Sequence, residues 1–323
     1  MRIALLAATA LLSAAPALAQ FQDRNLRLSV PVPKEHPMSI ALVKMATCTA
    51  DKSGGKLKMQ PFYDGVLGND INATQSARSG TIDMLITSTA PLVGMVPSWG
   101  VFDLPFLFNN EGEADQVLDG KVGDWFAAKL PAVGLVGLAW WENGFRHTTN
   151  SKRPITKLED FDGVKMRVMQ NTVYIDTFKS LGSNAVPMAF SEVYSALETK
   201  TVDGQENPFA NIENMKFYEV QKYLTLTRHA YAPLTLLISK KTWDTMSAAE
   251  QGVMRECARC WAATRSGAST ASRPRPRCQP EGQGHGGQRN HAGRDAAHPR
   301  QDARGLRAAR QGDRRRGDDA GVR

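Results

Sequence analysis

The sequence predicts an α/β fold arranged in two lobes. The chain has 323 residues, which is long enough for two globular lobes. Short runs of strand-forming residues alternate with helical stretches, an order typical of largely parallel sheets with helices on both faces. The sequence shows no internal repeat of solenoid period. Because ligands of such sheets bind at the ends of the strands, we expect the functional site there.

The alternation begins near Leu26 and can be followed along the chain. The first five elements form a β-α-β-α-β series, with strands over 26–32, 56–63 and 83–87 and helices over 38–52 and 70–79. Further strands are predicted over 135–141, 164–168 and 234–239.

Two capping signals predict helices in the second half of the chain. Ser191 directly precedes the helical stretch 192–197. Ser247 and Glu250 have the spacing of a capping box, so a helix is expected to begin beside them.

The net charge of +8 is confined to the C-terminal part of the chain. Residues 1–263 hold 26 Lys and Arg against 26 Asp and Glu, whereas residues 264–323 hold 14 Arg, no Lys and 6 acidic residues. The body is therefore neutral, and its charge gives no reason to expect nucleic acid as a partner.

The first nineteen residues have the pattern of a secretory signal peptide. Arg2 is followed by an apolar run over 3–12 and then by Ala17-Leu18-Ala19, so cleavage is expected after Ala19. The run is too short and too rich in alanine for a membrane span, and no cysteine follows the cleavage point to carry a lipid. We therefore expect a soluble, exported protein that is periplasmic or secreted.

The composition changes sharply after about Cys257. From residue 264 onward the chain has no Phe, Trp, Tyr, Ile or Met, and Gly, Arg, Gln, Ala and Asp dominate. Such a segment buries too little apolar surface to offset its conformational entropy, so residues 258–323 are expected to be a disordered tail. High Arg, Gly, Pro and Ala without Lys is typical of GC-rich DNA read in a wrong frame, which predicts a frameshift near Arg259.

Residue types that catalyse reactions or bind metals form no recognisable motif. The six His are scattered, and the body has no metal, nucleophile-elbow or phosphate-binding motif. Cys257 and Cys260 have redox or metal spacing, but no second pair follows at zinc-ribbon distance. Cys48 is expected to be a small buried hydrophobic residue. The sequence thus predicts a protein that is not an enzyme and holds neither metal nor cofactor.

Two arginines beside predicted strand ends are candidates for binding an anion. Arg146 and Arg167 each carry a planar guanidinium that can donate two parallel hydrogen bonds to a carboxylate. Within its apolar run, Arg167 is either an edge residue whose stem reaches solvent or an inward charge that needs an anionic partner. Composition alone favours a plain turn for the polar tetrapeptide 205–208.

Several motifs in order resemble the solute-binding proteins of tripartite ATP-independent periplasmic (TRAP) transporters, the DctP family. The resemblance covers roughly residues 25 to 256. It rests on 165–168 (KMRV), 187–197 (PMAFSEVYSAL) and 202–208 (VDGQENP), with further matches at 68–70, 80–84, 102–106 and 144–146.

The resemblance implies a fold and a binding site. It implies a two-lobed periplasmic-binding-protein fold with a ligand cleft between lobe I (20–145, with 232–257 returning to it) and lobe II (146–231). Arg167 is similar to the family's arginine that pairs with the substrate carboxylate, and Asn207 to its ligand-contacting asparagine. The resemblance also suggests ligand-binding roles for three other residues: Arg146 as an assisting arginine, Phe190 as a packing side chain and Ser88 as a specificity position on the opposite lobe.

The resemblance further implies a monomeric receptor that binds a small organic acid and delivers it to TRAP membrane permease subunits driven by a sodium gradient. Alternatives remain: a non-functional frameshifted product of such a gene, a secreted hydrolase or lyase on the same fold, or an Arg-rich arm for nucleic acid or anionic surfaces. Which organic acid binds is left open by the sequence.

Overall fold

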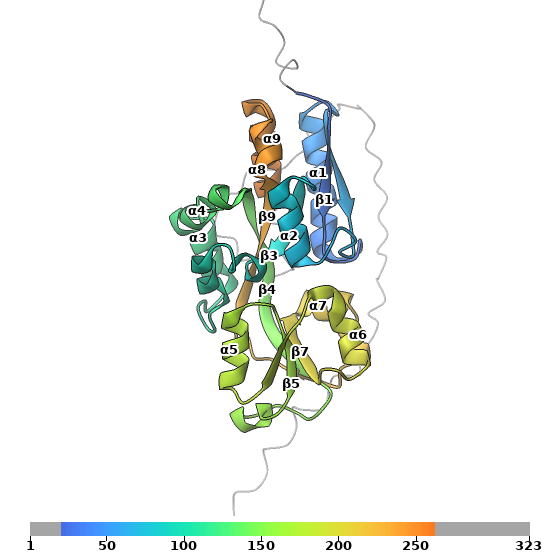
Figure 1. Cartoon of the computed structure of the whole chain (residues 1–323), viewed down its shortest axis with the longest axis vertical. Coiled ribbons are helices and arrows are strands. Elements are labelled where there is room, and N and C mark those ends of the chain that lie inside the picture. The colour runs from blue at the N-terminus through green and yellow to red at the C-terminus, as the bar shows by residue number, and fades with distance from the viewer. Residues whose placement is uncertain (1–20, 262–323) are drawn as a thin grey trace, which may run out of the picture. The chain divides into compact units, whose positions relative to one another are not determined.

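The computed structural model describes residues 21–261, which form a mixed α/β body (Figure 1). The expected signal peptide with its cleavage after Ala19, and the tail from residue 262 onward, lie outside the described residues. The strands are β1 (Arg24–Ser29), β2 (Leu57–Phe62), β3 (Met84–Ser88), β4 (Leu135–Asn150), β5 (Lys165–Val168), β6 (Asn184–Pro187), β7 (Gly204–Pro208), β8 (Tyr223–Thr225) and β9 (Tyr231–Ser239).

Helices connect these strands. The α-helices are α1 (Pro37–Lys52), α2 (Asp70–Ser79), α3 (Glu111–Leu118), α4 (Lys121–Ala127), α5 (Thr172–Ser180), α6 (Val193–Glu198), α7 (Phe209–Asn214), α8 (Lys240–Asp244) and α9 (Ala248–Trp261). Short 3₁₀ helices include η3 (Pro97–Asp103) and η6 (Phe190–Glu192). Among residues 21–261 no helix has the length and apolar character needed to cross a membrane.

The strands follow the order β2-β1-β3-β9-β4-β7-β5-β6, with β8 paired to β4. Pairing is parallel at both outer ends of this order, where β1 pairs with β2 and β3 and β5 pairs with β6 and β7. The middle is antiparallel, because β4 and β9 run side by side in opposite directions and pair with β7 and β3. The prediction of largely parallel sheets is therefore correct for the outer strands and wrong for the centre.

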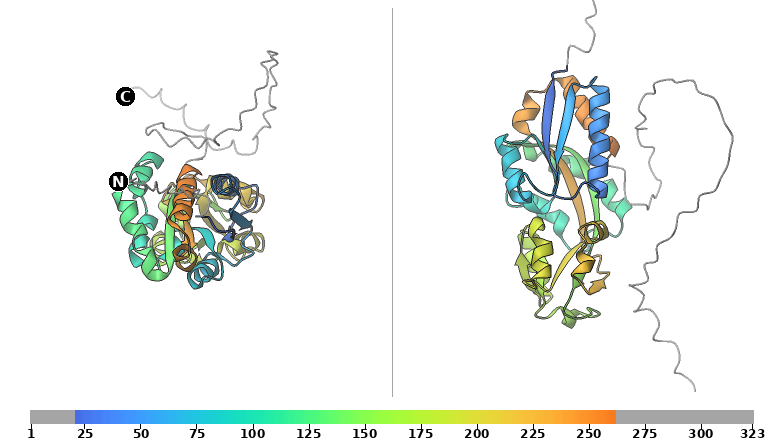
Figure 2. Two further views of the ribbon diagram at one scale, coloured as in Figure 1. Left: turned by 90° about the horizontal axis from the view of Figure 1, so that it is seen from above. Right: turned by 90° about the vertical axis from the view of Figure 1, so that its right-hand side faces the viewer.

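Strand β4 takes part in two sheets, and this exchange defines the two lobes. Up to Phe145 it pairs with β9, and from Arg146 onward it pairs with β7. We use lobe I for the sheet of β2, β1, β3, β9 and the first part of β4, and lobe II for the sheet of β7, β5, β6, β8 and the rest of β4. Figures 1 and 2 show β4 running from one group of elements into the other.

Lobe I buries apolar side chains on both faces of its sheet, as strand alternation requires. On β9, Leu236 and Ile238 join a core beneath α1, α8 and α9, whereas Leu237 joins a second core with residues of α2, α3 and α4. Helix α1 contributes a stripe at helical spacing to the first core, namely Met38, Ala41, Leu42 and Met45.

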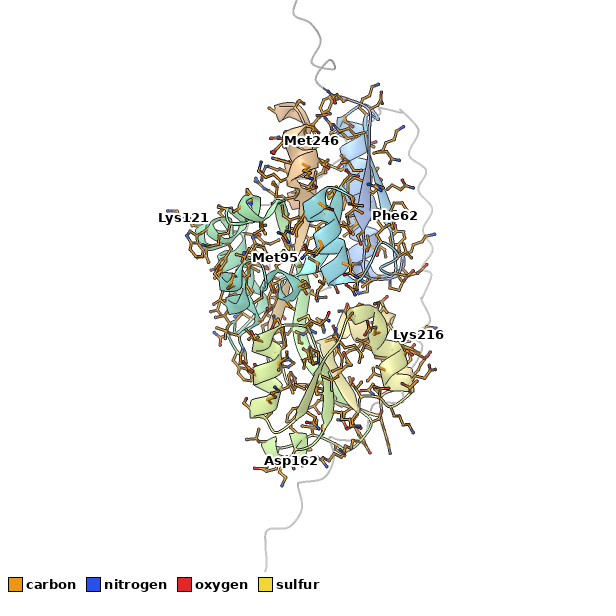
Figure 3. The ribbon with its side chains drawn as sticks, viewed as in Figure 1. Phe62, Met95, Lys121, Asp162, Lys216 and Met246 are labelled. Atoms are coloured by element: carbon orange, nitrogen blue, oxygen red, sulfur yellow. A yellow bond between two sulfur atoms is a disulfide. The ribbon has the colours of Figure 1, made fainter. Side chains whose placement is uncertain are left out.

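Lobe II is built in the same way on a smaller scale. Tyr174 and Phe178 of α5 pack on Met166 and Val168 of β5. A separate cluster joins α6 to the chain after β7, through residues such as Leu197 and Ile212. Charged side chains such as Lys121, Asp162 and Lys216 lie at the outside of the body (Figure 3).

Several local predictions are confirmed by the structure. Helix α2 has the predicted bounds, and α1 begins one residue early, at Pro37. The capping box is present, because the Ser247 amide donates to Glu250 Oε2 (2.7 Å) and the Glu250 amide donates to Ser247 Oγ (3.2 Å). The predicted C-terminal boundary is wrong by one helical turn. Helix α9 continues to Trp261, because Ala258 is buried and its carbonyl accepts a hydrogen bond from Trp141.

The prediction for Cys48 is also wrong. Cys48 on α1 and Cys257 on α9 form a disulfide, with their Cα atoms 5.9 Å apart. The two helices pack against each other in lobe I (Figure 1). A partner 209 positions away in sequence leaves no local signal, so the pairing follows only from the packing of the two helices.

Candidate functional site

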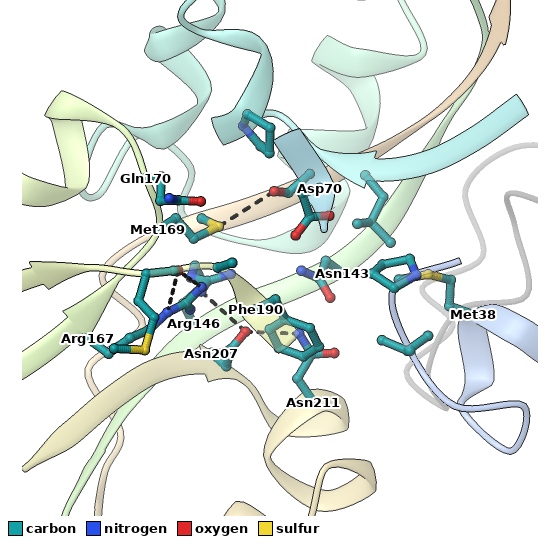
Figure 4. Close-up of a pocket in the computed structure, with 17 residues that line it drawn as sticks. Met38, Asp70, Asn143, Arg146, Arg167, Met169, Gln170, Phe190, Asn207 and Asn211 are labelled. Atoms are coloured by element: carbon teal, nitrogen blue, oxygen red, sulfur yellow. Dashed lines mark hydrogen bonds between the residues drawn. The ribbon is translucent and has the colours of Figure 1, made fainter. Parts of the chain in front are cut away.

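One pocket receives side chains from both lobes and contains all five residues singled out from the sequence. Its lining encloses about 560 Å³, a figure that includes space open to solvent. The predicted residues Ser88, Arg146, Arg167, Phe190 and Asn207 all line it. Figure 4 shows the labelled lining side chains, which include Asp70, Asn143 and Gln170.

Arg167 lies on β5 between two parallel neighbours, at the carboxyl end of the lobe II sheet. Its guanidinium is 2% exposed, and its Nε and Nη2 donate to the carbonyl oxygen of Met188 at 3.0 and 2.6 Å. Its Nη1 is buried with no hydrogen-bond partner among the described residues. Burial lowers the pKa of Arg167 to about 10, so the group remains charged at neutral pH. The pocket wall thus holds a buried cation with one unused donor.

Arg146, in contrast, has an acidic partner. Its Nε pairs with Glu206 Oε2, and its Nη2 donates to Glu206 Oε1 at 2.8 Å and to the Glu206 carbonyl at 2.7 Å. His229 contacts the same carboxylate, with Nε2 3.1 Å from Oε2. All three side chains are buried. Arg146 therefore lines the pocket with its charge already paired.

The ionisation of Glu206 follows from this pairing. Burial by itself works against the charged carboxylate, but the Arg146 guanidinium outweighs it and lowers the pKa of Glu206 to about 2. The pair is neutral as a unit at physiological pH. Of the two pocket arginines, Arg167 is thus the one that has no acidic hydrogen-bond partner among the described residues.

Asn207 belongs to a buried strand, which corrects the turn that composition favours for 205–208. All five residues of β7 are buried, because β7 lies between β4 and β5. The Asn207 amide group donates to Gln205 Oε1 at 2.6 Å, and its Oδ1 accepts from Arg146 and from Asn211 Nδ2 at 3.3 and 2.9 Å. Because the strand is buried, its polar side chains form hydrogen bonds with one another and with side chains that line the pocket.

Lobe I faces Arg167 with a carboxyl group and a hydroxyl. Asp70 is the first residue of α2, and Thr87 Oγ1 donates to its Oδ1 at 3.1 Å. Burial raises the pKa of Asp70, and the charge of Arg167 opposes that rise. Ser88 Oγ donates to Met169 Sδ at 3.5 Å, a contact from lobe I to lobe II. The lobe I face can therefore accept and donate hydrogen bonds to a ligand.

Phe190 joins the cores of the two lobes at the edge of the pocket. It begins η6, packs against the α1 core of lobe I and also against the α6 cluster of lobe II. Its ring centroid lies 6.3 Å from that of Phe217. Its placement suits an apolar contact with the carbon skeleton of a ligand.

Sequence reasoning missed several polar residues at or beside the pocket. They include Asp70, Asn143, Gln170, Glu206, Asn211 and His229. Glu206 and Asp70 lie inside quoted motifs, so the available signal was an acidic residue within a motif. Asn211 and His229 carried no signal, because the partners that bring them to the site, His36 and Glu206, lie 175 and 23 positions away.

Comparison with known proteins places the chain in a family. Residues 28–271 match the family DctP, described as bacterial extracellular solute-binding protein, family 7. The matched span begins close to the predicted start of the resemblance and continues past its predicted end at residue 256.

Individual relatives agree with this match. The chain is 40% identical over 224 residues to the 2,3-diketo-L-gulonate-binding periplasmic protein YiaO of Escherichia coli, covering 69% of this chain and 68% of the relative. It is 48% identical to the sugar acid binding protein DctPAm of Advenella mimigardefordensis, solved in complex with galactonate, with a TM-score of 0.74 and coverage of 75% and 78%.

A third relative is a TRAP periplasmic solute-binding protein from Polaromonas, solved with D-erythronate. It is 40% identical, with a TM-score of 0.72 and coverage of 74% of this chain and 78% of that one. These likenesses confirm the two-lobed fold of periplasmic binding proteins. The chain belongs to the DctP family of TRAP solute-binding proteins.

Proposed function

We propose that this protein is the extracytoplasmic receptor of a TRAP transporter and binds a sugar acid in the pocket between its lobes. In this proposal the receptor passes the acid to a sodium-coupled membrane permease. Arg167 binds the carboxylate, Asn207 donates a further hydrogen bond, and Arg146 holds the Asn207 side chain. Phe190 packs on the carbon chain, and Ser88 contacts the ligand from lobe I.

The observation that carries the proposal is the unpartnered Nη1 of Arg167. A buried donor on a charged group is costly unless a ligand accepts from it. A carboxylate is the ligand group that best matches a guanidinium, because the hydrogen bond is charge-assisted. Since Arg146 is already paired with Glu206, the pocket offers one uncompensated positive charge, which suits a single carboxylate.

A sugar acid fits the rest of the lining better than a dicarboxylate does. Asp70 lies opposite Arg167 on lobe I, and a carboxyl group there can accept hydrogen bonds from ligand hydroxyls. A second ligand carboxylate at the same place would meet a like charge whenever Asp70 is ionised. The relatives named for 2,3-diketo-L-gulonate, galactonate and D-erythronate also support a polyhydroxylated acid.

Calorimetric titration of the full chain with galactonate, erythronate and succinate tests the proposal. We expect the hydroxylated acids to bind more tightly than succinate, and each bound ligand to raise the unfolding temperature. A ligand at about a hundred times its dissociation constant stabilises the native state by about 2.7 kcal/mol, which a thermal melt detects readily. Absence of binding by every acid tested, with a folded protein, would contradict the receptor function.

Two other possibilities predict different results. A secreted enzyme on this fold would convert a bound acid, so the ligand recovered after prolonged incubation would be chemically changed; we expect it unchanged. A non-functional frameshifted product would bind none of the acids.

Export can be tested separately. When the full chain is expressed with its N-terminus intact, we expect the periplasmic fraction to contain a protein that begins at Gln20. Intact-mass measurement identifies the cleavage point. Retention of the full-length chain in the cytoplasm would contradict the periplasmic location.

A further inference from the structure

We propose that Asn211 is a positioning residue that couples contact between the lobes to the donor group of Asn207. His36 on lobe I donates to Asn211 on lobe II, and Asn211 in turn donates to Asn207. This inference rests on the proposed function of the pocket, because it assumes that Asn207 binds the ligand.

The direction of the first hydrogen bond follows from the tautomer of His36. His36 is the N-cap of α1, and its Nδ1 accepts a hydrogen bond from the Met38 amide at 3.1 Å. Nδ1 therefore carries no proton, so in the neutral ring Nε2 is the N–H group. Nε2 lies 3.0 Å from Asn211 Oδ1 and must be the donor. Burial lowers the pKa of His36, which favours this neutral form.

The second hydrogen bond then has only one possible direction. Because the oxygen of Asn211 faces His36, its amide nitrogen faces Asn207 and donates to Oδ1 at 2.9 Å. Because Asn207 Oδ1 accepts from Asn211 and also from Arg146 Nη2 at 3.3 Å, the amide nitrogen of Asn207 points the other way. One of its hydrogens goes to Gln205 Oε1, and the second is left for the pocket that Asn207 lines (Figure 4). A carboxylate requires a donor at this position.

The same contacts connect this orientation to the separation of the lobes. His36 and Asn211 are 3% and 5% exposed, so their hydrogen bond is shielded from water. It exists only while the start of α1 and helix α7 are in contact. A bond that forms only while the two lobes touch here favours the arrangement in which they touch, and the affinity for a ligand bound by both lobes increases by up to the same free energy. Asn211 therefore contributes to affinity without touching the ligand's carboxylate.

A substitution can remove the His36–Asn211 hydrogen bond and keep the N-cap of α1. In His36→Asn the shorter side chain keeps an oxygen that can accept from the Met38 amide, and Asn is among the best N-cap residues. It is too short to reach Asn211. We expect the ligand-free unfolding temperature to stay near that of the wild type and the dissociation constant for galactonate to rise about fivefold to tenfold, the loss of one buried hydrogen bond. The increase should lie mainly in the dissociation rate.

Asn211→Ala and the double variant complete a thermodynamic cycle. If both residues act through one bond, the double variant binds galactonate about as weakly as Asn211→Ala alone, which a general loss of packing would not produce. Asn214→Ala is the matched control, because Asn214 lies on the same helix and its side chain, within the described part of the chain, donates to the Ala210 carbonyl alone. We expect it to bind as the wild type does.

The outcomes separate the two proposals. If the wild type binds galactonate and His36→Asn binds equally well, or the effects of the two substitutions add, the coupling is contradicted and the receptor function stands. If the wild type binds none of the acids, the receptor function fails and this inference fails with it.

Discussion

Arg146 and Arg167 are of the same residue type and line the same pocket, yet their surroundings give them different roles. Glu206 neutralises Arg146, whereas the bonded partner of Arg167 is a backbone carbonyl that carries no charge. A charged guanidinium that bonds only a neutral oxygen retains its attraction for an anion. The distinction depends on the partner, and the partner is set by which strands lie side by side.

Replacement of Arg167 should weaken binding strongly. Arg167→Ala removes one member of a buried ion pair with the ligand and should cost about 3 to 5 kcal/mol of binding free energy. Arg167→Lys keeps the charge but loses the planar donor geometry, so we expect a smaller loss of at least about tenfold in affinity. Calorimetric titration with galactonate measures both. Arg27→Lys, at a half-exposed site on lobe I, is the control; equal affinity of Arg167→Ala and wild type would refute the role.

Asp103 is a buried acid whose side-chain hydrogen-bond partners among residues 21–261 are uncharged. It ends η3, is 1% exposed, and accepts hydrogen bonds from Thr89 Oγ1 at 2.8 Å and Asn171 Nδ2 at 2.6 Å. Burial raises its pKa from 3.8 to about 7, because these neutral donors and the more distant Arg146 only partly offset the loss of hydration. The group connects lobe I to the N-cap of α5 in lobe II.

The raised pKa predicts how stability depends on pH. Between about pH 4 and pH 7 the native Asp103 binds a proton that the unfolded chain has released, so the free energy of unfolding falls as pH rises through this window. The total effect is at most about 4 kcal/mol. Urea unfolding at several pH values should show the wild type losing stability relative to Asp103→Asn from pH 4 to 7 and no further above it. The exposed Asp176→Asn serves as control, and a constant difference between wild type and Asp103→Asn would contradict the assignment.

At the scale of elements, β4 shows why the centre of the sheet was harder to predict than its edges. The sequence pattern ends the strand at Trp141, whereas β4 continues to Asn150. The pairing with β9 shifts register between Glu142 and Gly144, and Gly144 has φ +105°, a value that favours glycine. The irregularity interrupts the alternation of apolar and polar residues by which a strand is predicted, although the strand itself continues.

The disulfide between α1 and α9 should contribute strongly to the stability of lobe I. Cys48 and Cys257 are 209 positions apart, and a cross-link that closes a long loop restricts the unfolded chain most. We expect the double variant Cys48→Ser, Cys257→Ser to lose about 4 kcal/mol of unfolding free energy in urea. Thr47→Ser, beside it on α1, should change stability by less than about 0.5 kcal/mol. Unchanged stability of the double variant would show that helix packing alone holds α9.

The elements that could be predicted are those with local signals. The bounds of α2 and the capping box of α9 depend on residues within one helical turn, and the outer strands have regular apolar patterns. Motifs pointed to Arg167 and Asn207, which line the pocket, and their ligand-binding roles stay predictions. The Glu206 partner of Arg146 and the disulfide arise from pairings between distant segments, which residue types alone do not reveal.

At the scale of the whole molecule, the composition of residues 264–323 predicts a frameshift in the gene, and this stays a prediction. Those residues hold 14 Arg and no Lys, in contrast to the balanced body. We expect the coding DNA for residues 250–323, read in all three frames, to contain an open shifted frame with the apolar periodicity of amphipathic helices. Resequencing tests this directly. If no shifted frame is open, or none has that periodicity, the frameshift is refuted.

The exchange of β4 between two sheets also sets the order in which an exported chain can fold. Lobe II is made from one continuous stretch, from the second part of β4 to β8, so its sheet can be completed as soon as that stretch has emerged. The sheet of lobe I can be completed only later, because β3 pairs with β9, which follows it by more than a hundred residues. In the proposed export, Cys48 reaches the periplasm before its partner Cys257 on α9. During the proposed export, the N-terminal strands of lobe I therefore lack β9, and Cys48 lacks its disulfide partner, until the stretch that forms lobe II has emerged.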